Sequence, residues 1–464
     1  MKRKAVGDIA AGRLPPEQLA QHFADVEPPL DRQAALVEAN RCLYCYDAPC
    51  IQACPTGIQI PHFIRRIATE DQRRSVRARS SALQDQRGAA EAILSANIFG
   101  GSCARVCPTE ILCEADCVRN VEGDSAIRIG ALQRYATDWV FEEGAQLFSR
   151  KPDSGRRVAV VGAGPAGLAC AHALAREGHR IDVFEARARP GGLNEYGIAA
   201  YKVPDFVQSE IDWLLSIGGI ELQFDQVLGS NLDLAQLCHD YDAVFLGIGL
   251  GAVNRLGLQG GDLDGVRHAV DFIAELRQCR DLSRMPVGRR VVVIGGGNTA
   301  IDAAVQSRRL GAERVTLVYR RGAESMSATH AEQAFARSEG VTLMHWAKPN
   351  RILSRDGQLT GVEFEYTELD ADGRLVGSGD RFNLLADSAL VAIGQALDED
   401  DLHENGGPPL HLRDGRIAVD EEYRTSLPGV WAGGDCVGGH TDLTVQAVED
   451  GKRAAASIHR ALEG

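Results

Sequence analysis

Cysteine is concentrated in the N-terminal quarter of this 464-residue chain. Eight of the twelve cysteines lie there, and they are Cys42, Cys45, Cys50, Cys54, Cys103, Cys107, Cys113 and Cys117. The other four belong to no cysteine motif. The basic N-terminus lacks the continuous apolar segment that directs export, so we expect a cytoplasmic protein whose thiols stay reduced. Bound metal therefore explains this density of cysteine better than disulfides do.

The cysteines fall into two runs with ferredoxin-like spacing. The first run is C-x2-C-x4-C-x3-C-P and the second is C-x3-C-P-x4-C-x3-C. Bacterial ferredoxins use C-x2-C-x2-C-x3-C-P, and their fourth cysteine serves the other cluster. Pro55 and Pro108 follow a cysteine in the same way, although the middle spacing is longer. Two such runs predict two iron–sulfur clusters; a zinc ribbon beginning at Cys42 and Cys45 is the alternative.

Charge and hydropathy argue against two classes of partner. The formal net charge of −14 disfavours nucleic acid, because phosphates reward a basic surface. No apolar run approaches the roughly 18 residues of a membrane-spanning helix, so we expect no membrane segment. The 44% hydrophobic and 25% charged residues are typical of a globular protein, and the length allows about three domains.

The pattern of apolar residues changes near residue 150. Before it, apolar residues recur at helical spacing over 83–98 and 129–148, and strand-like runs are few. A polar linker follows at 151–155. The first part of the chain is therefore predicted to be helical.

Beyond the linker, short Val/Ile strands alternate with Ala-rich helices. The pattern occurs near 157–185 and again near 289–319, which predicts parallel α/β sheets. The stretch 362–385 alternates apolar and polar residues instead. It predicts antiparallel strands with a turn at 370–373.

The first α/β unit carries the glycine loop Gly162-Ala-Gly-Pro-Ala-Gly167 between a buried strand and an Ala-rich helix. Its first glycine permits a tight turn, its second lets the backbone approach a pyrophosphate, and its third allows close helix–strand packing. The helix N-terminus supplies N–H donors to the anion. Glu185 ends the next strand, where an acid would hold ribose hydroxyls. These features predict a dinucleotide site; a glycine turn without a ligand is the alternative.

The second unit carries Gly295-Gly-Gly-Asn-Thr-Ala300 in the same context, but no acid ends its next strand. Arg320 and Arg321 stand there instead. Arginine at this place suits a 2′-phosphate, so the loop is predicted to bind NADPH in preference to NADH. The alternative is that the pair is solvated or bridges to Glu324.

Further glycine motifs relate the two loops to each other. Pro190-Gly-Gly192 follows the first unit, and Val430-Trp-Ala-Gly-Gly-Asp435 lies near the C-terminus. Together they resemble the two-dinucleotide-binding flavoprotein superfamily, in which the late Gly-Asp contacts the flavin ribityl chain. The resemblance assigns FAD to the first loop and nests the NAD(P)H domain inside the FAD domain. Gly247-Ile-Gly249 and Ala392-Ile-Gly394 would be the crossings between them.

The same resemblance implies two sets of cofactor contacts and no catalytic side chain, since the flavin performs the chemistry. The FAD set is Gly162, Ala163, Gly164, Pro165, Ala166, Gly167, Glu185, Gly192, Leu193, Lys202, Gly434, Asp435 and Thr444. The NAD(P)H set is Gly295, Gly296, Gly297, Asn298, Thr299, Arg320, Arg321, Ala392, Ile393 and Gly394.

The cysteine region is similar to a more specific family. Arg41-Cys-Leu-Tyr-Cys-Tyr-Asp-Ala-Pro-Cys50, Cys103-Ala-Arg-Val-Cys-Pro-Thr109 and Gly130-Ala-Leu-Gln-Arg-Tyr135 resemble the electron-input portion of dihydropyrimidine dehydrogenase. In bacteria that portion is a separate subunit, related to the glutamate synthase small subunit. The resemblance implies two 4Fe–4S clusters. The ligands of one would be Cys42, Cys45, Cys50 and Cys117, and those of the other Cys54, Cys107, Cys113 and the side-chain oxygen of Gln133, with Cys103 a buried non-ligand.

The resemblance covers essentially the whole chain and implies its fold class. We expect an α/β protein with an all-helical iron–sulfur domain at 1–150 and two nested Rossmann-like domains. The FAD-binding domain would comprise 155–250 and 392–464, and the NAD(P)H-binding domain 251–391.

The implied function is electron input. A hydride would pass from NADPH (NADH is possible) to FAD, and single electrons would pass through both clusters to a catalytic subunit. That partner, in a heterotetramer, would contain FMN and iron–sulfur clusters and reduce uracil or thymine to 5,6-dihydropyrimidines. Gln133 favours this family, since glutamate synthase small subunits tend to carry Glu there. The alternatives are that small subunit and a stand-alone NAD(P)H:acceptor oxidoreductase.

Overall fold

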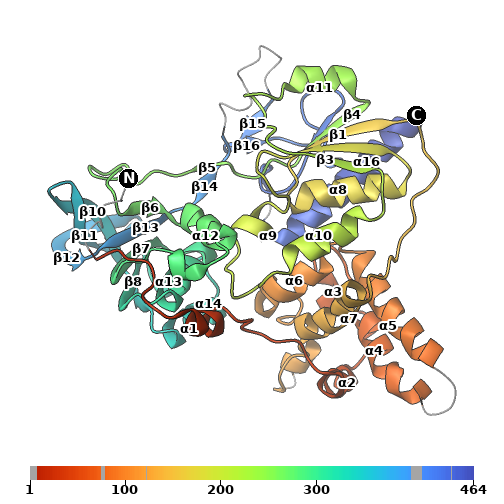
Figure 1. Cartoon of the computed structure of the whole chain (residues 1–464), viewed down its shortest axis with the longest axis horizontal. Coiled ribbons are helices and arrows are strands. Elements are labelled where there is room, and N and C mark those ends of the chain that lie inside the picture. The colour runs from red at the N-terminus through yellow and green to blue at the C-terminus, as the bar shows by residue number, and fades with distance from the viewer. Residues whose placement is uncertain (1–7, 75–78, 122, 399–409, 440) are drawn as a thin grey trace. The chain divides into compact units, whose positions relative to one another are not determined.

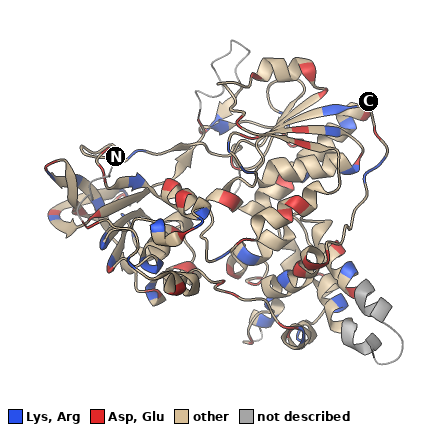
Figure 2. Ribbon diagram, in the orientation of Figure 1, with Lys and Arg blue, Asp and Glu red and all other residues tan. Residues whose placement is uncertain are grey.

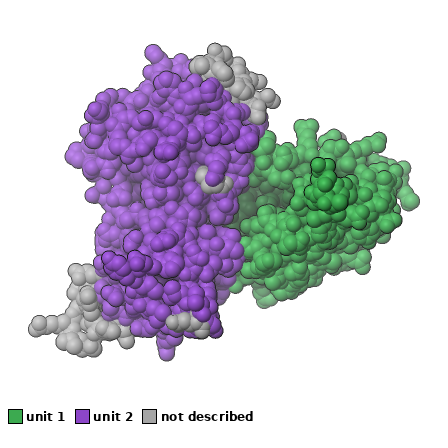
Figure 3. Space-filling view, turned by 180° about the vertical axis from the view of Figure 1, so that it is seen from behind, with its two compact units in different colours: residues 1–26, 196–204, 252–396 green, residues 27–195, 205–251, 397–464 purple. Residues whose placement is uncertain are grey.

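The computed structural model describes residues 8–74, 79–121, 123–398, 410–439 and 441–464 (Figure 1). Basic and acidic residues are interspersed along the described ribbon (Figure 2). The chain forms two compact units whose segments alternate along the sequence (Figure 3). As far as they are described, residues 1–26, 196–204 and 252–396 form unit 1, and residues 27–195, 205–251 and 397–464 form unit 2.

The N-terminal part of unit 2 is built from helices. They are α2 (Arg32–Asn40), α3 (Pro49–Gln52), α4 (Ile60–Arg74), α5 (Arg79–Leu94), α6 (Gly100–Val106), η1 (Thr109–Ile111), η2 (Val118–Asn120) and α7 (Ile129–Glu143). Helix α7 begins at the predicted residue and is closed by Gly144, whose φ of 59° is the left-handed conformation common after helices. Phe63 and Leu132 are fully buried in a core that also contains Cys113 and Cys117. The helices therefore surround the cysteines.

The second part of unit 2 is a five-stranded parallel sheet in the order β17-β4-β1-β2-β3. Its strands are β1 (Arg157–Val161), β2 (Arg180–Phe184), β3 (Ile220–Gln223), β4 (Ala243–Leu246) and β17 (Val430–Ala432). Its helices are α8 (Pro165–Arg176), α9 (Leu193–Tyr196), α10 (Val207–Leu215), α11 (Leu234–Asp240) and α16 (Thr444–Glu463), and β15 (Leu412–Arg413) pairs with β16 (Arg416–Ile417). Helix α16 packs on α8. The C-terminal segment thus completes the sheet that begins at β1.

Unit 1 contains a second five-stranded parallel sheet, in the order β6-β13-β7-β8-β9. Its strands are β6 (Val266–His268), β7 (Arg290–Gly295), β8 (Arg314–Val318), β9 (Thr342–Met344) and β13 (Ser388–Ala392). Its helices are α1 (Pro16–His22), α12 (Ala269–Gln278), η3 (Leu282–Arg284), α13 (Asn298–Arg309), η4 (Ala323–Ser325) and α14 (His330–Ser338), and β5 (Ala252–Val253) pairs with β14 (Gln395–Ala396). Both glycine loops therefore connect a central parallel strand to a helix.

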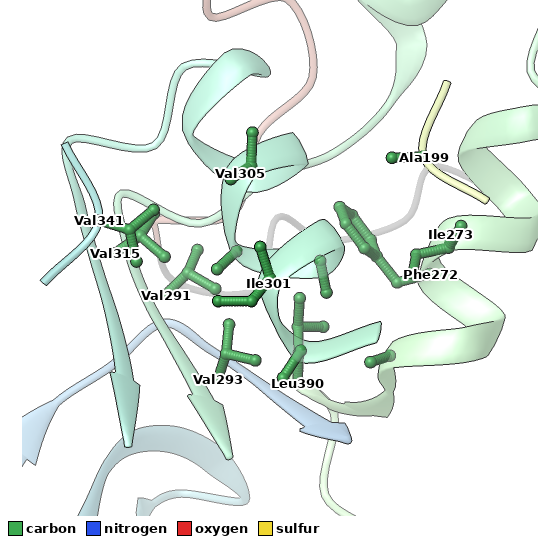
Figure 4. Packing of buried hydrophobic residues seen from close by; sticks show 14 of the residues in the cluster. Ala199, Phe272, Ile273, Val291, Val293, Ile301, Val305, Val315, Val341 and Leu390 are labelled. Carbon is green, nitrogen blue, oxygen red and sulfur yellow. The ribbon is translucent and has the colours of Figure 1, made fainter. Parts of the chain in front are cut away.

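A three-stranded antiparallel sheet of β10 (Ala347–Arg355), β11 (Gln358–Leu369) and β12 (Leu375–Leu385) completes unit 1. It confirms the predicted antiparallel stretch and its turn after Leu369. The core of unit 1 packs α13 onto the parallel sheet through residues such as Val293 and Ile301 (Figure 4). Ala199, from the short segment 196–204, lies beside Phe272 and Ile273 in the same core (Figure 4). None of the helices described here has both the length and the apolar character needed to cross a bilayer.

Candidate functional site

The first glycine loop has the geometry of a pyrophosphate site. Gly162 has a φ of +100°, and a Cβ on it would lie 2.4 Å from the Gly247 carbonyl oxygen. A Cβ on Gly167 would lie 1.9 Å from the Gly162 carbonyl oxygen, which no side chain can tolerate. Helix α8 begins directly after Gly164, so its free N–H groups face the loop. The loop can therefore bind a phosphate group with backbone donors alone.

Glu185 lies where a ribose-binding acid is expected. It follows β2 and is 7% exposed. One carboxylate oxygen accepts a hydrogen bond from the Ala163 amide at 2.8 Å, and the other accepts from the Arg187 amide at 2.8 Å. Burial raises the pKa of Glu185, while these two backbone hydrogen bonds act to lower it. The hydrogen bond from Ala163 thus holds the Glu185 carboxylate against the glycine loop.

Two further FAD candidates of unit 2, Gly192 and Gly434, approach the same loop closely. A Cβ on Gly192 would lie 2.8 Å from the Gly164 Cα, and a Cβ on Gly434 would lie 2.9 Å from Ala166. Ala163, Pro165 and Asp435 lie next to these residues in sequence, and Leu193 is 40% exposed. The last candidate, Thr444, begins α16. The site therefore combines the start of α8, the turn before α9 and the start of α16.

Asn194 is a residue of this region that the sequence did not reveal. It is fully buried, and the Thr444 hydroxyl donates a hydrogen bond of 2.8 Å to its side-chain oxygen. Its side-chain nitrogen has no hydrogen-bond partner among the described residues. A buried amide donor without a partner beside a glycine loop fits a site that binds a polar ligand such as FAD.

Lys202 belongs to unit 1, whereas the other FAD candidates belong to unit 2. Its ammonium group lies 2.9 Å from an oxygen of Asp302 and 2.6 Å from an oxygen of Glu332. The hydroxyl of the buried Tyr201 donates to Asp302 at 3.2 Å. Burial acts to lower the pKa of Lys202, but the two carboxylates outweigh it and raise the pKa overall. Lys202 therefore ties the segment 196–204 to α13 and α14.

The second glycine loop runs from β7 through Gly295, Gly296 and Gly297 to Asn298 and Thr299, which begin α13. A Cβ on Gly296 would lie 2.4 Å from the ring of Tyr319, and one on Gly297 would lie 3.1 Å from the Ser327 hydroxyl oxygen. Tyr319 and Ser327 therefore line the loop, although neither belonged to the predicted set. Ala392 lies beside Gly295 at the end of β13, and Ile393 and Gly394 follow it.

Arg320 and Arg321 follow β8 and are exposed. Among the described residues neither guanidinium lies within 4.0 Å of a carboxylate, so the bridge to Glu324 does not form. Two unpaired positive charges next to a dinucleotide loop can bind a 2′-phosphate. The expected preference for NADPH stays a prediction.

Four of the cysteines line one cavity. Cys42, Cys45, Cys50 and Cys117 surround it together with apolar side chains such as Ile60, Ile64, Ile127 and Ile129. Burial and then the neighbouring thiol of Cys117 raise the pKa of Cys50 to about 12. Thiols in such a setting become thiolates only when a cation compensates their charge. Four cysteines that line one apolar cavity fit the first predicted cluster.

A second group contains Cys54, Cys107 and Cys113. Burial, followed by the charges of neighbouring thiols, raises the pKa of Cys107, and burial with Glu114 and Cys54 raises that of Cys113. Cys103 is 3% exposed and is also close enough to interact with Cys54 and Cys107. Three cysteines of the second predicted set therefore share one region, with Cys103 beside them.

Gln133, the remaining member of that set, lies on the buried side of α7 and is 7% exposed. Its side-chain nitrogen donates a hydrogen bond of 2.7 Å to the Gly100 carbonyl oxygen, at the start of α6. This bond fixes the orientation of the amide. Helix α6 ends at Val106, directly before Cys107, so Gln133 contacts the helix that leads to a predicted cluster ligand.

Two family comparisons match this chain. Residues 156–451 match the family described as pyridine nucleotide-disulphide oxidoreductase. Residues 19–145 match the one described as dihydropyrimidine dehydrogenase domain II, 4Fe-4S cluster. These matches account for FAD and NAD(P)H binding in the α/β parts and for 4Fe–4S binding in the helical part.

Full-length relatives have two different names. The chain is 35% identical over 461 residues to the glutamate synthase (NADPH) small chain of Escherichia coli K12, covering 95% of this chain and 94% of that one. It is 32% identical over 446 residues to the NAD-dependent dihydropyrimidine dehydrogenase subunit PreT of Escherichia coli K12, covering 96% and 98%. Of the solved structures, Mycobacterium tuberculosis FprA in complex with NADPH matches with a TM-score of 0.55 and 19% identity, over 68% of this chain and 85% of that one, which is a likeness of fold.

Proposed function

Because the chain belongs to the pyridine nucleotide-disulphide oxidoreductase family, we propose that it is the electron-input subunit of a dihydropyrimidine dehydrogenase. It is an NAD(P)H-dependent flavin and iron–sulfur oxidoreductase. The proposal adds the acceptor, a partner subunit with FMN and iron–sulfur clusters that reduces uracil or thymine. When bound, FAD would accept a hydride and release its electrons one at a time to the clusters.

In this proposal the residues of the chain bind the cofactors and orient them. Glu185 would hold the ribose hydroxyls of FAD, and the start of α8 would hold the pyrophosphate. Arg320 and Arg321 would bind the 2′-phosphate of NADPH. Cys42, Cys45, Cys50 and Cys117 would hold the first cluster. Hydride transfer needs no acid or base from the protein, so no side chain is assigned a catalytic role.

The observation that carries the proposal is the hydrogen bond from the Gln133 amide nitrogen to the Gly100 carbonyl. Glutamate synthase small subunits tend to have Glu at this position. A carboxylate there would face a carbonyl oxygen with no proton to donate, and such a buried contact costs about 1–3 kcal/mol. This contact therefore favours Gln over Glu at position 133 and supports the dihydropyrimidine dehydrogenase proposal.

A second candidate is the glutamate synthase small subunit, and one observation favours it. Arg320 and Arg321 form no ion pair in the described part of the chain and suit NADPH. The glutamate synthase relative is named for NADPH, whereas the dihydropyrimidine dehydrogenase relative is named NAD-dependent. Gln133 and the arginine pair therefore support different candidates.

The two candidates differ in the final acceptor, so the acceptor is the decisive measurement. The chain would be isolated with its native partner, and anaerobic oxidation of NADPH and NADH would be followed by absorbance. Uracil would be added to one sample and 2-oxoglutarate with glutamine to another. Ferricyanide would serve as an acceptor that needs no partner.

We expect uracil to stimulate oxidation and 2-oxoglutarate with glutamine to have no effect. The reverse result would assign the chain to glutamate synthase. Oxidation with ferricyanide, but with neither uracil nor 2-oxoglutarate and glutamine, in a sample without a stoichiometric partner, would contradict both candidates. The chain would then be a stand-alone reductase.

A further inference from the structure

Helix α10 contacts both the predicted FAD site and the helix that leads to the second predicted cluster. A Cβ on Gly191, in the turn beside the first glycine loop, would lie 3.3 Å from Val207 and 3.2 Å from Ile211 of α10. Glu210, which precedes Ile211 on α10, contacts α6 through its side chain. All of these residues belong to unit 2. Glu210 is thus a titratable group at a junction that the electrons of the proposed function would cross.

Within the part of the chain that the structure describes, the hydrogen bonds of the Glu210 carboxylate come from the first turn of α6. One oxygen accepts from the Gly101 amide at 2.8 Å and from the Ser102 amide at 3.1 Å. The other accepts from the Ser102 amide at 3.2 Å and from the Ser102 hydroxyl. Glu210 and Ser102 are both fully buried. Among the described residues, the carboxylate is therefore held by backbone amides and one hydroxyl of α6, and no cation forms an ion pair with it.

This turn of α6 contacts Gln133, a predicted ligand of the second cluster, and its helix leads to Cys107, another predicted ligand. Gly100 accepts the hydrogen bond from Gln133, and Gly101 and Ser102, the next two residues, donate to Glu210. The helix ends at Val106, directly before Cys107. A charge on the second cluster would therefore act on Glu210 along α6 in a buried region, where electrostatic interactions are weakly screened.

The other charges around Glu210 are paired with one another. Arg105 of α6 forms an ion pair of 2.7 Å with Asp138 of α7, which also contacts Arg134 at 3.2 Å. Cys103 of α6 lies close enough to interact with Glu210, and Phe206 stacks on Arg105 at 3.6 Å. Burial raises the pKa of Glu210 to about 7, although the bonds from Ser102 and the charge of Arg105 act to lower it. Both protonation states are therefore accessible near neutral pH.

We propose that Glu210 is the proton acceptor coupled to reduction of the second cluster. One electron enters the cluster from the flavin, and one proton from solvent binds a carboxylate oxygen of Glu210. The net charge of the buried junction stays constant, and both leave when the cluster is reoxidised by its acceptor. The inference rests on the proposed passage of electrons through this cluster, but it requires neither a particular partner nor a particular substrate.

The test is a redox titration of the isolated full-length holoprotein from pH 6 to pH 8, monitored by electron paramagnetic resonance with chemical mediators. The signal of the second cluster is identified as the one lost in Cys107→Ser. We expect its potential to fall as pH rises and to become independent of pH in Glu210→Gln, which keeps the shape of the side chain. A tenfold difference in proton affinity between the two redox states corresponds to about 59 mV.

Three controls make the result specific. Asp212→Asn removes an exposed charge from the same helix and should leave the pH dependence unchanged. The signal of the first cluster should be unaffected by Glu210→Gln. Ser102→Ala removes one hydrogen bond to Glu210 and should move the pH range of the response upward without abolishing it. A potential independent of pH in the wild type, or an unchanged pH dependence in Glu210→Gln, would overturn the proposal, whatever the acceptor assay shows.

Discussion

Replacing Arg320 with Ala tests the nucleotide preference most directly. Arg320 follows β8 beside the second glycine loop, is exposed and has no carboxylate within 4.0 Å among the described residues. A hydrogen bond to a charged group contributes about 1.5–3 kcal/mol, and exposure places this one near the lower limit. A loss of about 1.5 kcal/mol corresponds to about tenfold in affinity. We expect kcat/KM for NADPH to fall about tenfold and that for NADH to stay constant.

The assay uses ferricyanide as the acceptor, so that the partner subunit does not limit the rate. Arg314→Ala is the matched control, because Arg314 is also exposed but begins β8 at the end away from the loop. Arg321→Ala should lower the NADPH value by a similar factor, since Arg321 is equally exposed. Equal losses for NADPH and NADH, or no loss in either arginine variant, would refute assignment of a 2′-phosphate to this pair.

Three further predictions concern the cofactor sites and the flavin domain. Gly167→Ala should abolish FAD binding, measured as flavin absorbance per chain, because its Cβ would lie 1.9 Å from the Gly162 carbonyl oxygen; a full flavin content would contradict this. Cys107→Ala should lower the iron content, whereas Cys103→Ala should not, and equal iron loss in both would make Cys103 a ligand. Burial lowers the pKa of His172 to about 3, so the unfolded chain binds one more proton below pH 6.5. The free energy of unfolding should then fall by about 1.4 kcal/mol for each pH unit of acidification between pH 6 and pH 4. Denaturant titrations of His172→Leu should lack this contribution to the pH dependence.

The local signals in the sequence predicted the local structure well. Gly162 and Gly167 could be identified from the sequence because only glycine fits at either position. Gly162 has a positive φ, and a Cβ on Gly167 would lie 1.9 Å from the Gly162 carbonyl oxygen. Glu185 was found by its place after a strand, since the end of a parallel strand fixes where a side chain lies. Residues whose role depends on the conformation of their own segment can therefore be predicted from the sequence.

Contacts between distant segments were not readable in this way. Lys202 was assigned to FAD because of the motif around it, and that assignment stays a prediction; its ammonium group contacts Asp302 and Glu332 in unit 1, which the motif did not indicate. Nothing in the sequence connects those three residues, because the contact depends on how the segment 196–204 packs with α13 and α14. Asn194 was missed for the same reason, since it is defined by burial and by Thr444 on a distant helix.

The division into units separates the two redox steps of the proposed function. The FAD candidates other than Lys202, all the cysteines of both predicted clusters, and the contacts of α10 with α6 belong to unit 2. Lys452 on α16 adds a second connection there, because its ammonium group donates to the Ala96 carbonyl at 2.9 Å and to the Thr56 carbonyl at 3.3 Å, two residues after Cys54. Transfer of electrons from flavin to clusters would thus occur inside one compact unit, whose internal distances are fixed by packing. Only the delivery of the hydride would require the other unit, so we expect Arg320→Ala to change the nucleotide preference without changing the iron content of the clusters.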